Sequence, residues 1–75
     1  MFKVYSTSWC SYCNKAKGLL QTLKKPFKEF DIDTAENFDL LVEELGYTPR
    51  TIPQVFYNDT HLGGYEELKK YLEDK

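Results

Sequence analysis

Two cysteines separated by two residues, Cys10 and Cys13, constrain this chain more than any other feature. They are the only cysteines in the sequence. The apolar run at residues 2–6 is typical of a β-strand, and the residues after Cys13 have helical spacing. At a strand-to-helix junction, the unpaired N–H groups of the helix stabilise an anion, and the thiolate is the reactive form of cysteine. The pair therefore indicates thiol chemistry.

The residues after the cysteines predict a helix and then a second strand. Apolar residues recur at helical spacing and form one face of a helix over residues 12–24: Ala16, Leu19, Leu20 and Leu23. Pro26 ends this helix. Residues 27–32 partly alternate apolar and charged side chains, which favours a strand.

A second helix is predicted to follow. Asp33 precedes Glu36 by three residues, which resembles a capping box. Helical spacing then recurs at Phe38, Leu41, Val42 and Leu45. Gly46 is a suitable C-terminal stop for this helix.

The second half of the chain predicts a hairpin and a last helix. The expected elements are a strand at 54–57, a turn at 58–59, an edge strand at 60–62, a break at 63–64 and a helix at 65–72. The full order is β-α-β-α-β-β-α. We expect the first β-α-β unit to be parallel and right-handed, and the later hairpin to be antiparallel.

The position of the two cysteines assigns them different roles. In a helix that begins near Ser11, Cys10 lies at the exposed end and Cys13 lies one turn inside, where it is more buried. Cys10 then attacks a disulfide to form a mixed disulfide, and Cys13 resolves it by attacking Cys10.

Three other readings of the pair remain open. A zinc site needs further ligands, and only His61 is available as a nitrogen ligand. A purely structural disulfide would close a loop too short to constrain the unfolded chain strongly. The cysteines could also be buried without chemical use. A CxxC beside a β-α-β pattern favours redox chemistry over all three.

Pro53 stands at the start of a strand that otherwise pairs, which needs a reason. One reason is a cis Ile52–Pro53 bond, and the alternative is a trans proline that opens the strand. With a cis bond, the peptide groups of Ile52 could pair with an extended peptide.

Two adjacent glycines, Gly63 and Gly64, precede the last helix. They let backbone approach a ligand closely, and the helix N-terminus that follows can hold a carboxylate. A glycine turn without a ligand is the alternative.

Composition excludes several classes of function. The net charge of −2 argues against nucleic acid as a partner. No stretch is long and apolar enough for a membrane span, and no apolar signal segment opens the sequence. Two cysteines are too few for a disulfide-stapled secreted scaffold, so we expect a reducing, cytoplasmic setting.

Taken together, these motifs identify a family. The segments Cys10-Ser11-Tyr12-Cys13, Thr51-Ile52-Pro53 and Gly63-Gly64-Tyr65 resemble the glutaredoxins, in order and over essentially the whole chain. The size resembles that of bacterial or viral dithiol members. The resemblance implies one domain over residues 1–75 with a thioredoxin-like α/β fold, a four-stranded mixed sheet flanked by three helices. It implies glutathione as co-substrate, recycled by glutathione reductase and NADPH.

The resemblance also implies a set of site residues. Cys10 would be the nucleophile and Cys13 the resolving thiol. The expected glutathione-binding residues are Tyr12, Arg50, Thr51, Ile52, Pro53, Gly64, Tyr65, Glu66 and Glu67. Glu66 and Glu67 differ from the residues common in the family, where a small hydroxyl residue and Asp are usual. We expect backbone N–H groups to hold the ligand's γ-glutamyl carboxylate and a side-chain acid to hold its ammonium.

Two departures from the family leave alternatives. Ser11 replaces a common proline, and some members without that proline hold a 2Fe–2S cluster between two subunits. A cluster here would use Cys10 as a metal ligand; otherwise no metal is expected. Thr7 stands where Lys or Arg often binds glutathione's glycyl carboxylate, so we expect weaker glutathione binding. A thioredoxin-like reductant served by thioredoxin reductase is the second alternative. The expected state is a monomer, with disulfide-bearing proteins such as ribonucleotide reductase as substrates.

Overall fold

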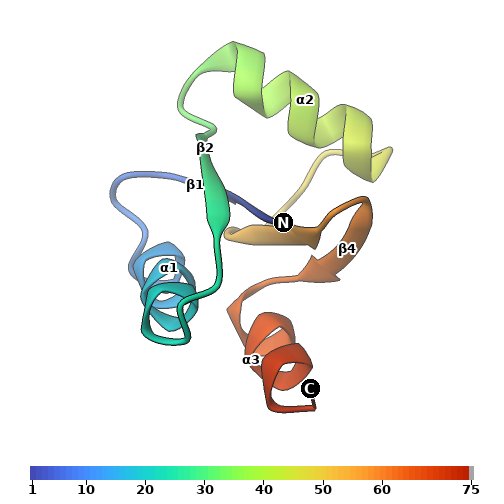
Figure 1. Cartoon of the computed structure of the whole chain (residues 1–75). Coiled ribbons are helices and arrows are strands. Elements are labelled where there is room, and N and C mark those ends of the chain that lie inside the picture. Colours follow the sequence, from blue (N-terminus) through green and yellow to red (C-terminus); the bar gives the residue numbers. More distant parts are fainter. Residues whose placement is uncertain (75) are drawn as a thin grey trace.

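The computed structural model describes residues 1–74, and its elements follow the order β-α-β-α-β-β-α (Figure 1). The strands are β1 (Phe2–Ser6), β2 (Phe27–Asp31), β3 (Gln54–Tyr57) and β4 (Thr60–Gly63). The helices are α1 (Ser11–Thr22), α2 (Ala35–Leu45) and α3 (Tyr65–Glu73). The predicted order and thioredoxin-like fold class are confirmed.

The four strands form one mixed sheet in the order β2-β1-β3-β4. β1 and β2 are parallel, with Phe2 opposite Phe27 and Ser6 opposite Asp31. β3 runs antiparallel to both β1 and β4. The parallel pair of β1 and β2 requires a crossover connection, which α1 provides. Because β1 also pairs with β3, with Tyr5 opposite Gln54, the loop after Ser6 lies beside the loop before Gln54.

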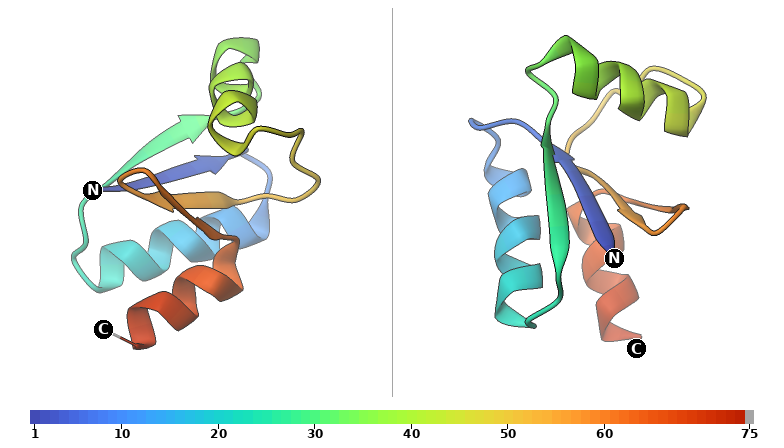
Figure 2. Two further views of the ribbon diagram at one scale, coloured as in Figure 1. Left: turned by 90° about the vertical axis from the view of Figure 1, so that its right-hand side faces the viewer. Right: turned by 45° about the horizontal axis from the view of Figure 1, so that its top comes forward.

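Helices cover both faces of the sheet. Figure 2 shows α1 and α3 on one face and α2 on the other. Side chains alternate along β1, so Val4 packs against α1 and α3 while Tyr5 packs toward α2. The core under α1 and α3 contains the buried residues Phe2, Val4, Ala16, Leu20, Val55 and Leu68. The core under α2 contains Tyr5, Leu41 and Phe56.

The predicted capping box at the start of α2 is wrong. Thr34 is the N-cap, in an extended conformation, and its hydroxyl accepts the N–H of Asn37 at 3.4 Å. Asp33 instead donates its N–H to Oδ1 of Asp31 at 2.9 Å. Because this turn makes Thr34 the N-cap, Glu36 is the second residue of the helix. A capping box needs Glu or Gln at the third residue, so the box does not form. Gly46 ends α2 in the left-handed region at φ 81°, as predicted.

Several element ends differ slightly from the sequence predictions. α1 ends at Thr22 instead of residue 24, because Lys24 adopts the left-handed region at φ 56°. The N–H of Lys25 then bonds to the carbonyl of Leu20 at 2.8 Å. The chain therefore turns before Pro26. β2 ends one residue earlier than predicted, while β4 and α3 each extend one residue further.

Candidate active site

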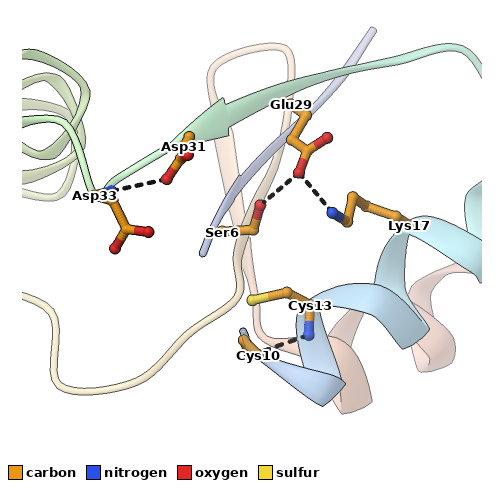
Figure 3. Close-up of polar contacts among 7 residues, drawn as sticks. All are labelled: Ser6, Cys10, Cys13, Lys17, Glu29, Asp31 and Asp33. Carbon is orange, nitrogen blue, oxygen red and sulfur yellow. Dashed lines mark hydrogen bonds and ion pairs between the residues drawn. The ribbon is translucent and has the colours of Figure 1, made fainter. Parts of the chain in front are cut away.

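Cys10 is the N-cap of α1, with extended backbone angles of φ −94° and ψ 118°. Its Sγ accepts the N–H of Cys13 at 3.2 Å, as Figure 3 shows. Both cysteines are free thiols. An N–H directed at the sulfur from a helix N-terminus stabilises the negative charge of a thiolate nucleophile.

The two sulfurs differ in burial. Cys10 is 8% exposed, whereas Cys13 is fully buried. The prediction that Cys13 is the more buried cysteine is confirmed, but Cys10 is less exposed than expected. The reason lies in the loop before β3, since the carbonyl oxygen of Ile52 lies 3.9 Å from Cys10 Sγ. Trp9, just before Cys10, is 75% exposed.

Cys13 is held in its thiol form. Burial raises its pKa to about 12, and the hydrogen bond and charge of Cys10 act in the same direction. The backbone of Thr7 and the charge of Lys17 oppose this rise. Cys13 is thus both inaccessible and costly to ionise in the folded protein.

The peptide bond between Ile52 and Pro53 is cis, which decides between the two alternatives left by the sequence. Pro53 is buried, and the side-chain amide of Gln54 donates to the carbonyl of Thr51 at 2.8 Å. The carbonyl of Ile52 faces Cys10. The segment therefore forms one wall of the site opposite Cys10.

A groove of about 220 Å³ opens beside this wall. Its lining consists of Tyr12, Thr51, Ile52, Pro53, Gly64, Tyr65, Glu66 and Glu67. These are the predicted glutathione-binding residues apart from Arg50. The rings of Tyr12 and Tyr65 lie 6.1 Å apart, and Lys15 Nζ lies 4.9 Å from the centre of the Tyr12 ring. The sequence analysis did not name Lys15 as a neighbour of Tyr12, although residues three apart in a helix lie close enough for contact.

Arg50 lies outside this groove, in an adjacent hollow of about 320 Å³ that also contains Trp9 and Thr7. Thr51 and Ile52 line both spaces, so the two adjoin along this segment. Thr7 is 4% exposed, and its hydroxyl has no hydrogen-bond partner within residues 1–74.

The turn before α3 requires a glycine at position 63. Gly63 has φ +124°, and a Cβ there would lie 2.7 Å from Cγ of Glu67. Gly64 donates its N–H to Oε1 of Glu67 at 2.7 Å. One Glu67 oxygen thus already holds a helix-end N–H, a bond that the longer side chain of Glu makes possible.

Within residues 1–74, no three or more His, Cys, Asp or Glu side chains cluster suitably for a metal ion. His61 instead contacts Oε1 of Gln54 at 2.7 Å. Over the same range, the helices are too short or too polar to cross a membrane.

A free dithiol at the first helix of this sheet is the site of a thiol-disulfide oxidoreductase with a thioredoxin-like fold. The glutaredoxin family model matches residues 2–62. A glutaredoxin of Pseudomonas aeruginosa is 38% identical over 66 residues, which cover 87% of this chain and 76% of that protein. The chain belongs to the glutaredoxin family.

Solved structures agree with this assignment. The crystal structure of glutaredoxin 1 from Francisella tularensis complexed with cacodylate has a TM-score of 0.79 and 29% identity, over 97% of this chain and 92% of that one. A buckwheat glutaredoxin–glutathione complex has a TM-score of 0.79 and 26% identity, over 97% of this chain and 68% of that one.

Proposed function

We propose that this glutaredoxin reduces protein disulfides and glutathione mixed disulfides with glutathione as its reductant. The observation that carries the proposal is the groove beside Cys10, which gathers the Tyr12, cis-proline and glycine segments into one lining. The buckwheat relative, solved as a glutathione complex, supports the same ligand here.

The reaction proceeds in two exchanges. The Cys10 thiolate attacks a substrate disulfide, forms a mixed disulfide and releases one substrate thiolate, which takes up a proton. Cys13 then loses its proton and attacks Cys10 Sγ, which releases the second substrate thiol and leaves a Cys10–Cys13 disulfide. Two glutathione molecules reduce that disulfide and become glutathione disulfide, which glutathione reductase recycles with NADPH. A glutathione mixed disulfide at Cys10 can also be resolved directly by a second glutathione.

We assign the parts of glutathione to different residues of the groove and of the hollow beside it. Its cysteinyl unit would lie along Thr51 and Ile52, where an extended peptide can pair with the backbone opposite Cys10. Its γ-glutamyl end would reach the N-terminus of α3. The carboxylate of Glu66 or Glu67 would bind the ammonium group of that end. Arg50, in the adjoining hollow, is the residue we assign to the glycyl carboxylate.

The test is the choice of reductant. The purified protein is given a small disulfide together with either glutathione, glutathione reductase and NADPH, or thioredoxin reductase and NADPH. Consumption of NADPH with glutathione supports the proposal. Turnover only with thioredoxin reductase would overturn it and favour the thioredoxin-like alternative.

Ribonucleotide reductase is the protein substrate we would assay first, and we propose a monomer that acts in the cytoplasm. The 2Fe–2S alternative, which rests on Ser11, predicts a coloured dimer after anaerobic purification. A colourless monomer with full turnover would argue against it.

A further inference from the structure

The hollow that contains Trp9 lies where the chain leaves the two parallel strands in opposite directions. The loop after β1 leads to α1 on one face of the sheet, and the loop after β2 leads to α2 on the other (Figure 2). Where the connections of neighbouring parallel strands diverge in this way, a crevice opens at their carboxyl ends, and ligands commonly bind there. We call this space of about 320 Å³ the Trp9 hollow. Its lining comes from the loops after β1 and β2, the start of α2 and the loop before β3.

The walls of the Trp9 hollow are mostly apolar. Ile32, Phe38 and Pro49 line it and are half-buried. Trp9 adds a side chain that is 75% exposed, and a large aromatic side chain left exposed beside apolar walls is typical of a surface that a partner covers. Thr7 lies in the same lining, and its buried hydroxyl lacks a hydrogen-bond partner within residues 1–74. A polar group in that state is typical of a place where a bound molecule supplies the missing bond.

The size and charge of the Trp9 hollow narrow the choice of occupant. Arg50 and Asp33 both line it and are both exposed, so one positive and one negative side chain leave it without net charge. Its volume of about 320 Å³ is near the lower end of the range of ~300–1,000 Å³ for small-molecule pockets, which suits one large side chain. The occupant that fits best is therefore an uncharged, apolar side chain.

The Trp9 hollow also adjoins the reactive sulfur. Trp9 directly precedes Cys10 in the chain. Ile52 lines the hollow, and its carbonyl oxygen lies 3.9 Å from Cys10 Sγ. Thr51 and Ile52 also line the groove on the other side, so an extended peptide that pairs with this segment would span both spaces. A polypeptide joined to Cys10 by a disulfide thus has one of its neighbouring residues at the hollow.

The placement proposed for glutathione indicates which neighbour this is. Its γ-glutamyl end is assigned to the groove, and its glycyl end to Arg50 in the Trp9 hollow. In a protein substrate of the same chain direction, the residue after the cysteine takes the place of that glycine. Glycine has no side chain, so glutathione would leave the apolar walls of the hollow uncovered. A protein substrate can cover them.

We propose that the Trp9 hollow binds the side chain of the residue that follows the attacked cysteine in a protein substrate, and that it favours a large apolar side chain such as Phe or Leu. The hollow then distinguishes among protein disulfides at the first exchange. This inference rests on the proposed function for the direction of the bound chain, but glutathione is not needed to observe it.

Three acetylated and amidated tetrapeptides test the preference, each as a mixed disulfide with thionitrobenzoate. One has glycine on both sides of its cysteine, one has Phe after the cysteine and one has Phe before it. The Cys10 thiolate bonds to the peptide sulfur, the old disulfide bond breaks, and thionitrobenzoate leaves with the electron pair because it is the leaving group of lower pKa. Stopped-flow absorbance with an excess of reduced protein gives the rate constant for each peptide.

We expect the peptide with Phe after the cysteine to react about five- to tenfold faster than the glycine peptide. In Trp9→Ala this ratio should fall to within about twofold of unity, whereas the ratio for the peptide with Phe before the cysteine should not change. Ratios are compared because any general effect of the substitution on Cys10 cancels in them. Trp9→Phe keeps an aromatic ring and should retain most of the preference. Tyr47→Ala removes another aromatic side chain, 57% exposed and outside the hollow, and is the matched control with no expected change.

The outcomes separate the possible failures. Equal rates for the glycine peptide and the peptide with Phe after the cysteine would overturn the inference. So would a preference that persists in Trp9→Ala, because the side chain would then bind elsewhere. Loss in Trp9→Ala of a preference for Phe before the cysteine would overturn the direction of the bound chain. Turnover with thioredoxin reductase alone would overturn glutathione as the reductant, but the preference and its loss in Trp9→Ala would still support the hollow, since glutathione is absent from the peptide reaction.

Discussion

The carbonyl oxygen of Ile52 faces Cys10 Sγ at 3.9 Å, although 42 residues separate the two in sequence. Cys10 is therefore enclosed between the start of α1 and the segment that precedes the cis-proline. Trp9 and Tyr12 are exposed next to it, so we expect a substrate disulfide to approach from that side. Its extended backbone can then meet the peptide groups of Ile52 while its sulfur meets Cys10.

Substitution of each cysteine should separate the two exchange steps. Cys10→Ser should lose reduction of both protein disulfides and glutathione mixed disulfides, because the hydroxyl is a poor nucleophile at this site. Cys13→Ser should keep removal of glutathione from mixed disulfides and lose reduction of protein disulfides. Parallel assays with a glutathionylated peptide and a disulfide protein check this. Loss of both activities in Cys13→Ser would contradict the assigned roles.

The raised pKa of Cys13 predicts a loss of stability at alkaline pH. In the unfolded chain the thiol ionises near its ordinary pKa of about 8.5. In the folded protein burial raises that pKa to about 12, so between these values the unfolded state binds fewer protons. The stabilisation is complete below the unfolded pKa and is lost as the pH rises through the folded one.

We expect the free energy of unfolding of the reduced protein to fall by about 2 kcal/mol more than that of Cys13→Ser between about pH 8 and pH 10. Burial also raises the pKa of Tyr5, but Tyr5 is present in both proteins and its effect cancels in the comparison. Urea unfolding at the two pH values measures the difference. If the free energies of unfolding of the two proteins changed in parallel with pH, the Cys13 thiol would ionise at the same pH in the folded and unfolded states, against this prediction.

Most of the fold was predictable because local patterns and long-range pairing agree. Ala16 and Leu20 repeat at helical spacing and are fully buried, and Val4 and Tyr5 alternate onto the two cores. The start of α2 was mispredicted because Asp33 and Thr34 are both good caps. The choice between them depends on a turn made by the Asp31 side chain.

The groove was predictable as a set of residues, but its limits were not. Arg50 is adjacent to Thr51 in sequence, yet the chain directs it into the neighbouring hollow. The pairing of Lys17 with Glu29 depends on the parallel register of β1 and β2 and on the crossover through α1. No local pattern carries that information, because the two residues come together only after the sheet has formed.

Glu44 joins α2 to the central strand, and its removal should destabilise the protein. Its carboxylate accepts hydrogen bonds from Lys3 at 2.8 Å and from the hydroxyl of Tyr5, which is 1% exposed. Glu44→Ala leaves the buried hydroxyl without this partner, at an expected cost of about 1–3 kcal/mol. Glu43→Ala, at the exposed neighbouring position, should change stability by less than about 0.5 kcal/mol. Urea unfolding of the two variants provides the comparison.

The same contact predicts sensitivity to acid. Burial raises the pKa of Glu44, but the hydrogen bonds from Lys3 and Tyr5 outweigh it, so the net shift is downward. A lowered folded pKa gives stability that is present above the unfolded pKa of about 4.3 and lost as the pH falls through the folded value. The stability difference between the wild-type protein and Glu44→Gln should therefore shrink in acid. A constant difference down to about pH 2 would contradict the assignment.

Alanine substitutions at two glycines, one in a turn and one in a helix, should change the stability of the protein in opposite directions. A Cβ on Gly63 would lie 2.7 Å from Cγ and 2.9 Å from Oε1 of Glu67, at a φ of +124° that side chains rarely adopt. Gly63→Ala should therefore cost more than about 1 kcal/mol, and it should also weaken the bond between Glu67 and the N–H of Gly64.

Gly18 lies in α1, where an added Cβ meets nothing within 4 Å. Gly18→Ala should stabilise the protein by about 0.8–1 kcal/mol, because alanine restricts the unfolded chain and favours the helix. Urea unfolding measures both changes, and glutathione binding followed by calorimetry shows whether the first also disturbs the groove. Since Glu67 lines that groove, Gly63→Ala should lower the affinity while Gly18→Ala leaves it unchanged. Equal affinities in the two variants would mean that the position of Glu67 is irrelevant to the ligand.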